Sequence, residues 1–454
     1  MRGMVGEAIS IERAERVDHQ LVRGMGITAL TANIINSTIG AGIFVLPALV
    51  SKNLGAAAPI AFVICAIAMV LFVTCFALAG SRVSLTGGLY AYVEVAFGKY
   101  VGFLGGILYL LTAVLAVASV VNVFVDSIAN LAPFLHHPAA RVAAIALVYG
   151  ILVVINIRGV REGAGAVTFV TAAKLLPILL FLSVGIFFIH PANLGWPGWP
   201  DSKALGDSVI LLIFAFVGIE VALIPSGEVK NPTRTVPRSA YLALIITTII
   251  YVLIQLVAQG TLGNDLGNHP TAPLAEAASK FLGEIGRTIL LSGATVSAFG
   301  FVTSDILSSP RMIFAFGRDG TLPAWFAHVH KRFRSPDVAL TSYALIAFGL
   351  SAAGTFERLA VISNVAVLLM YLLCCSGCWF LINRDIRAEG PPIKFAGMKL
   401  VPVLAVGAII WILTEAALSE SSVGSDTRAG LRIAAVVLII STVVYFAGKP
   451  LRRK

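Results

Sequence analysis

The amino-acid sequence predicts an all-α polytopic membrane protein with about twelve transmembrane helices. Hydrophobic residues make up 58% of the 454-residue chain and charged residues only 12%, against about 25% charged residues in ordinary soluble domains. A soluble fold of this size could not bury so much apolar surface in one core, whereas lipid solvates apolar side chains. Apolar runs of about 20 residues recur along the whole chain, and basic residues concentrate in alternate connections between them.

Apolar runs long enough to cross a bilayer give the expected order of the helices. Two of them, 101–131 and 286–316, exceed the length needed, and such runs tilt or protrude. The stretch 264–285 is too polar to span and predicts a helix in an outer loop. No run shows the alternation of a β-barrel strand. The expected spans are 26–50, 58–80, 101–131, 140–157, 163–190, 207–228, 237–261, 286–316, 338–355, 359–382, 398–418 and 430–447.

The distribution of basic residues predicts the orientation of these spans. If the N-terminus is cytoplasmic, the inner segments hold about three times as many Lys and Arg residues as the outer segments, which is the positive-inside pattern. The net charge of +10 therefore reflects topology and attraction to an anionic leaflet, and no aromatic–basic stretch suggests nucleic acid. We expect a multi-pass protein of the cell (inner or plasma) membrane with both termini in the cytoplasm. Its expected partner is the lipid bilayer and not nucleic acid.

Two of the expected spans contain polar, glycine-rich interruptions near their middle. The first contains NSTIGAGIF at 36–44, and the sixth contains FAFVGIEVALIPSGE at 214–228. Backbone groups freed at a break persist in a membrane only where they line a cavity or are buried in protein. The ends of half-helices suit an amino-acid zwitterion, because their N–H groups attract a carboxylate and their carbonyls attract an ammonium group. The alternative is that these glycines serve close helix packing.

The positions of the interruptions also predict the domain organisation. They fall in the first and sixth spans, which correspond to each other if the first five spans and the next five are inverted repeats. The expected segments are a cytoplasmic tail over 1–25, helices 1–5 over 26–190, helices 6–10 over 207–385, two further helices over 398–447 and a cytoplasmic tail over 448–454.

Three ionisable residues lie deep in the expected spans, where charges are rare and costly. Lys174 lies about 16 Å into the fifth span, at 1.5 Å per residue, and could pair with carbonyls at the first break. Charging and discharging it would couple protons to a gate, whereas the alternative is a permanently charged tether. Glu220, after the second break, is either a proton sensor or a structural strut. Asp305, in the eighth span, either faces the substrate cavity and favours a cationic group or bonds to a neighbouring helix.

Histidine and cysteine residues do not indicate catalysis or a bound metal. All seven histidines lie in tails, in loops or at span ends, so a buried histidine proton relay is not expected. Cys375 and Cys378 could form a redox or metal pair, but small, weakly polar residues in apolar runs are typical of helix packing. The sequence contains no HExxH or GxSxG motif. We therefore expect no enzyme activity, no cofactor and no metal.

Several short motifs, in their order and spacing, resemble the amino acid–polyamine–organocation (APC) superfamily, and in particular its proton-coupled, sodium-independent amino-acid permeases. The resemblance covers nearly the whole chain. The motifs that carry it are STIGAGIF at 37–44, TGGLYAYVEVAFG at 86–98, FAFVGIE at 214–220, EVKNPTRTVPRS at 228–239 and PRMIFAFGRDGTLP at 310–323.

The resemblance implies a five-plus-five inverted-repeat fold with two added C-terminal helices, like the sodium-coupled leucine transporter fold. Lys174 matches a lysine that lies where sodium-coupled relatives bind a cation, which favours sodium independence. Arginine–agmatine exchangers lack that lysine, but they carry a gating aromatic residue at the place of Phe214. Many relatives carry Asn or an aromatic residue at the position of Asp305, so the resemblance leaves the side-chain specificity open.

The resemblance also implies which residues bind an amino acid. Those expected near its α-carboxylate are Ser37, Thr38, Gly40, Ala41 and Gly42. Those expected near its α-amino group are Ile35 and the backbone of Phe214, Ala215, Phe216 and Gly218. Asp305 is added as a substrate residue on account of its depth. Lys174 and Glu220 are the candidates for proton coupling.

Two functions of the same class and two of other classes follow from these patterns. The leading hypothesis is proton-coupled amino-acid symport by alternating access, and the alternative is an amino-acid or amine exchanger, possibly one for a cationic substrate. A transport-derived receptor usually carries an appended signalling domain, and both tails here are short. An intramembrane enzyme would need a convergent nucleophile and base, which the sequence does not place at depth.

Overall fold

The computed structural model describes residues 26–83, 89–158, 164–195, 198–220, 229, 232–386 and 392–447, without the side chains of 164–172 and 232–233. Its regular elements are helices, which confirms the all-α fold. The α-helices are α2 (Ile27–Thr38), α3 (Leu46–Leu54), α4 (Ala58–Gly80), α5 (Leu89–Phe97), α6 (Lys99–Ala129), α7 (Pro138–Arg158), α8 (Ala164–Gly185), α9 (Ser202–Phe216), α10 (Pro232–Leu262), α11 (Pro273–Ser308), α12 (Pro310–Arg318), α13 (Asp337–Ala353), α14 (Phe356–Asn383), α15 (Leu400–Leu418) and α16 (Ser422–Ala447).

The length and hydropathy of these helices fit a polytopic membrane protein. Eight segments of the described chain are long and apolar enough to cross a membrane, and two shorter apolar helices cover Ala173–Phe188 and Asp337–Ala353. The first expected span is divided into α2 and α3, with the 3-10 helix η1 (Gly42–Phe44) between them. The sixth expected span begins with α9, and its remainder from 221 to 228 lies outside the described residues.

The structure differs from the expected elements in two places, whereas the long run 286–316 is continuous, since Ser309 between α11 and α12 is itself helical with φ −63° and ψ −38°. The helix expected within 264–285 is the first part of α11, which turns at Gly283 with φ 62° and ψ −157°. Helix α5 was not expected as a separate element, and its nine residues are too few to cross a bilayer.

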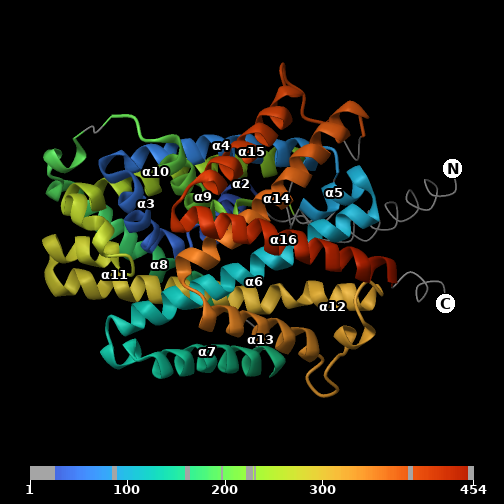
Figure 1. Ribbon diagram of the computed structural model, residues 1–454, viewed down its shortest axis with the longest axis horizontal. Helices are drawn as coiled ribbons and strands as arrows, with labels where there is room; N and C mark the ends of the chain where they lie inside the picture. Colours follow the sequence, from blue (N-terminus) through green and yellow to red (C-terminus); the bar gives the residue numbers. More distant parts are fainter. Residues whose placement is uncertain are drawn as a thin grey trace.

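Helix α6 runs through the middle of the bundle (Figure 1) and contacts α5, α7, α11, α13, α14 and α16. In its most apolar stretch 72% of the residues are buried, against 22% in α7 and α16. Such exposed apolar surface on α7 and α16 is what lipid would cover. Helix α6 packs against both α11 and α14, and these three helices form the wall on which the cavity described below is built.

Candidate substrate site at two helix breaks

The first break separates α2 from α3. Helix α2 ends at Thr38, because Ile39 has φ −74° and ψ 85° and leaves the helical conformation. The Thr38 hydroxyl donates to the Ile34 carbonyl at 2.8 Å, the local bond by which threonine competes with regular helical pairing. After Gly40 the chain turns into η1 and then α3, whose first N–H groups have no acceptor within their own helix.

The second break ends α9. Asp201 begins this helix, and its carboxylate accepts from the N–H groups of Lys203 and Ala204, as an N-cap residue does. The helix stops at Phe216, and Val217 follows with φ −59° and ψ 137°. Gly218 then has φ +109°, a conformation that residues with a Cβ rarely adopt.

The two breaks touch each other through Gly218. A Cβ atom at this position would lie 2.8 Å from the carbonyl oxygen of Ser37 and 3.0 Å from its carbonyl carbon. No side chain fits at that distance, so glycine is needed both for the positive φ and for the close approach. Gly218 therefore allows the end of α9 to pack directly on the end of α2.

Tyr251 of α10 joins the same two breaks with one hydroxyl. It donates to the carbonyl of Thr38 at 3.0 Å and to the carbonyl of Ala215 at 2.8 Å. Its side chain is completely buried, and its ring lies edge-on to Phe216 with the centroids 5.3 Å apart. Two carbonyls freed by helix breaks thus share one donor, which satisfies polar groups that lipid could not.

Phe214 and Gly42 form a further contact between the two broken spans. A Cβ at Gly42 would come within 2.9 Å of the Phe214 ring. The same ring lies edge-on to Phe356 at the start of α14, with the centroids 5.5 Å apart. This aromatic contact packs the two breaks against α14.

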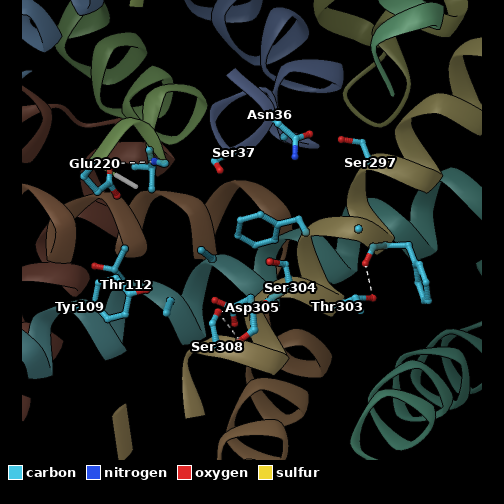
Figure 2. A pocket seen from close by; sticks show the side chains of 18 of the residues that line it. Asn36, Ser37, Tyr109, Thr112, Glu220, Ser297, Thr303, Ser304, Asp305 and Ser308 are labelled. Atoms are coloured by element: carbon cyan, nitrogen blue, oxygen red, sulfur yellow. Dashed lines mark hydrogen bonds between the residues drawn. The ribbon is translucent and has the colours of Figure 1, made fainter. Parts of the chain in front are cut away.

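A cavity of about 410 Å³ lies between the breaks and the α6–α11–α14 wall. Its size is in the range of small-molecule sites, and Figure 2 shows polar side chains reaching it from several helices. The lining residues are Asn36, Ser37, Gly40, Tyr109, Thr112, Ala113, Ala116, Lys174, Val217, Gly218, Glu220, Ser297, Phe299, Gly300, Phe301, Thr303, Ser304, Asp305, Ser308 and Met370.

Lys174 of α8 reaches the cavity at the first break. Its ammonium group donates to the backbone carbonyl of Asn36, two residues before α2 ends. The side chain is 6% exposed, so this bond links α8 to α2 with little competition from water. A charge-assisted hydrogen bond of this kind is about twice as strong as a neutral one, and its strength therefore depends on the charge of Lys174.

Glu220 is held at the second break from two sides. Its Oε2 atom accepts from the N–H of Gly218 at 3.0 Å and from the hydroxyl of Tyr371 at 2.9 Å. Tyr371 belongs to α14 and packs against Phe72 and Phe76 of α4. This carboxylate connects the irregular backbone after α9 to the rigid wall of the cavity.

Asp305 lies on the α11 side of the cavity. One carboxylate oxygen accepts from the hydroxyl of Ser309 at 2.7 Å, and the other accepts from the hydroxyl of Tyr343 on α13. In Figure 2 it lies near Ser304 and Ser308, away from Asn36 and Ser37 across the cavity.

The residues expected from the sequence fall into two groups around this cavity. Ser37, Gly40, Lys174, Gly218, Glu220 and Asp305 line it. The others are not among its lining residues but lie at or next to the breaks, and they are Ile35, Thr38, Ala41, Gly42, Phe214, Ala215 and Phe216. The carbonyls of Ile35, Thr38 and Ala41 accept backbone N–H groups of Ile39, Gly40 and Phe44. The binding of substrate by these residues stays a prediction.

The tyrosines that hold the site together were not predicted from the sequence. Tyr251 is one of four completely buried polar residues spaced four apart on α10, with Thr247, Gln255 and Gln259. That spacing places them on one face of the helix, and a polar stripe in an apolar span would have indicated an inward-facing surface. Tyr343 and Tyr371 stand without such a pattern in α13 and α14, and only the fold reveals their carboxylate partners.

Helices α2 and α9 both end in irregular backbone beside one cavity, and such an arrangement in an all-helical membrane protein is typical of carriers of small solutes. The sequence profile of the amino acid permease family matches residues 25–443. The chain belongs to the amino acid permease family and thereby to the APC superfamily, and the resemblance of its motifs to that superfamily is confirmed.

Named relatives extend over most of the chain. The methylthioribose transporter of Bacillus subtilis is 28% identical over 88% of this chain and 90% of its own length. The serine/threonine exchanger SteT of the same organism is 26% identical, with 91% of this chain and 96% of the exchanger covered. The branched-chain amino acid permease BcaP, also from Bacillus subtilis, is 25% identical over 89% of this chain and 91% of its own length.

Proposed function

We propose that this permease is a proton-coupled, sodium-independent amino-acid symporter of the cell membrane, with both termini in the cytoplasm, working by alternating access. The cavity between the two breaks is its substrate site. There the N–H groups that follow the first break bind the α-carboxylate, and carbonyls at the break ends bind the α-amino group. The hydroxyl of Ser37 and the backbone of Gly40 and Gly218 lie at the cavity wall to support this pose.

The contact of Lys174 with the Asn36 carbonyl is the observation that carries the proton-coupling proposal. The charged ammonium group holds α8 against the end of α2, and loss of the proton weakens this bond because the charge assistance disappears. Proton binding would then bias the equilibrium between two arrangements of the first break, which is how a ligand shifts a conformational equilibrium. We assign to Glu220 the role of holding the second break, since its Oε2 atom already has two donors.

Purified protein in liposomes tests this proposal. With an inward proton gradient, the wild type should accumulate an amino acid above its external concentration, and replacing sodium by choline should leave accumulation unchanged. Lys174→Ala should lose gradient-driven accumulation and keep exchange of internal for external substrate. Lys203→Ala is the matched control, because Lys203 is an exposed lysine at the start of α9. Accumulation by Lys174→Ala equal to that of the wild type would overturn the proton-coupling role.

Amino-acid exchange is the second candidate function, and one observation favours it. A relative covering 91% of this chain is named a serine/threonine exchanger. Uptake into liposomes with nothing preloaded separates the two functions, because an obligate exchanger needs internal substrate and a symporter does not. Uptake that appears only after preloading, whatever the pH gradient, would establish exchange.

A further inference from the structure

Asp305 has no cationic partner in the part of the chain that the structure describes. Its carboxylate accepts hydrogen bonds from Ser309 and Tyr343, and none of the ion pairs among the described residues includes it. Hydroxyl donors orient a carboxylate but do not neutralise its charge. Since a carboxylate at membrane depth normally pairs with a cation or faces a polar cavity, the counter-charge of Asp305 remains to be identified.

The other two charged residues that line the cavity already have partners. Lys174 donates to the Asn36 carbonyl at the first break, and Glu220 accepts from Gly218 and Tyr371 at the second break. Lys174 and Glu220 carry opposite charges, so Asp305 leaves the cavity wall with an excess of one negative charge when all three are ionised. A bound cation would remove this excess.

The surroundings of Asp305 suit a group that donates hydrogen bonds. Hydroxyl side chains lie around this side of the cavity, at Tyr109, Thr303, Ser304 and Ser308 (Figure 2). Hydroxyl oxygens accept hydrogen bonds from an ammonium or guanidinium group, which has several donors and no acceptor. Ser304 and Ser308 line the cavity and are exposed, so the protein does not close off this side of it.

The position of Asp305 relative to the breaks fits a side chain better than a backbone group. The α11 residues on the cavity wall extend from Ser297 to Ser308, a rise of about 16 Å at 1.5 Å per residue. Figure 2 shows Asn36 and Ser37 across the cavity from Asp305. An amino acid whose backbone lies at the breaks would therefore direct a long side chain toward α11.

We infer that Asp305, with the hydroxyl groups around it, forms a subsite for a positively charged side chain, so that the substrates include amino acids ending in a primary amine or a guanidinium group. This inference rests on the proposed transport of amino acids through this cavity. The subsite would determine which side chains the protein selects, a point that the resemblance to the APC superfamily leaves open.

The test is competition for binding to the purified protein by lysine and by norleucine, two amino acids with the same unbranched four-carbon side chain that differ by the terminal ammonium group. The wild type should bind lysine about tenfold to a hundredfold more tightly than norleucine, as expected for a hydrogen bond to a charged group. Asp305→Asn should lose this preference, while its affinity for norleucine changes by less than about threefold. Asp305→Glu keeps the charge and should keep a preference for lysine.

Asp265→Asn is the matched control, because it makes the same chemical change at an exposed residue away from the cavity. A wild type that binds norleucine as tightly as lysine, or an Asp305→Asn protein that still prefers lysine as the wild type does, would overturn the subsite. The first of these measurements needs no variant, so poor folding of Asp305→Asn cannot leave the inference untested. Failure of the wild type to bind or transport any amino acid would instead contradict the proposed function itself.

Discussion

At the scale of single residues, Gly218 and Tyr251 determine how the two broken helices meet. Gly218 allows the end of α9 to lie against the Ser37 carbonyl, and Tyr251 donates one hydroxyl to a carbonyl from each break. The sequence predicted the first of these residues, because glycine in an apolar span is conspicuous. It did not predict the second, because a tyrosine in an apolar helix is ordinary until its partners are known.

Replacing Gly218 by alanine should damage transport. The Cβ would overlap the Ser37 backbone, and the positive φ would strain any residue other than glycine by about 1–3 kcal/mol. We expect a lower melting temperature and uptake at least about tenfold slower. Gly349→Ala is the control, because Gly349 lies within α13 with open space around it, and alanine favours a helix there by about 1 kcal/mol. Unchanged uptake by Gly218→Ala would show that the breaks need not touch.

Replacing Tyr251 by phenylalanine should loosen both breaks at once. The Ala215 carbonyl loses the Tyr251 donor, whereas the Thr38 carbonyl keeps the N–H of Gly40. An unsatisfied buried polar group costs about 1–3 kcal/mol. The melting temperature should fall, and the affinity for substrate should fall with it. Tyr149→Phe removes a hydroxyl that bonds to Ser351 between α7 and α13, and it should leave substrate affinity unchanged. Equal effects of the two variants on affinity would contradict the positioning role of Tyr251.

At the scale of helices, α14 fixes the second break through the pair of Tyr371 and Glu220. The ring of Tyr371 is packed against two phenylalanines of α4, so its hydroxyl has a defined position. Residues that share a hydrogen bond couple energetically. We therefore treat the pair as a structural link and not as two independent residues.

A double-mutant cycle with Glu220→Gln and Tyr371→Phe measures this link. The two single variants should lower the melting temperature, and the double variant should be less unstable than their sum, with a coupling energy of about 0.5–3 kcal/mol. Glu220→Gln should still accumulate substrate along a proton gradient, since Lys174 is the proposed proton site. If a stable Glu220→Gln protein no longer accumulates substrate along a proton gradient, Glu220 is the proton site instead of Lys174.

At the scale of the whole molecule, composition and apolar runs predicted the all-helical membrane fold, and polar or charged residues beside glycine predicted where α2 and α9 end. Local patterns could not reveal which helices meet around the cavity. The bond of Asp305 to Tyr343 joins two helices that no sequence spacing relates. The bond of Lys174 to the Asn36 carbonyl is the pairing with the first break that the depth of Lys174 had suggested. The boundaries of the two inverted repeats and the amino-acid binding residues remain predictions.

The distribution of basic residues makes a prediction about orientation. Both termini should face the cytoplasm, because the segments on that side hold about three times as many Lys and Arg residues as the others. A reporter that is active only in the cytoplasm should therefore be active when fused to the C-terminus, and one that is active only outside should be inactive. The reverse result would invert the assignment of inner and outer ends.

The central claim is that the cavity between the two breaks is the place where an amino acid binds. Ser304 is exposed and lines this cavity, and all five native cysteines are buried and free, so Ser304→Cys should be modified by a maleimide well above background. At ten times its dissociation constant, a transported amino acid should slow this modification about tenfold by mass action, while Ser202→Cys at the exposed start of α9 should react at an unchanged rate. A rate at Ser304→Cys that no transported amino acid alters would contradict the assignment of the site.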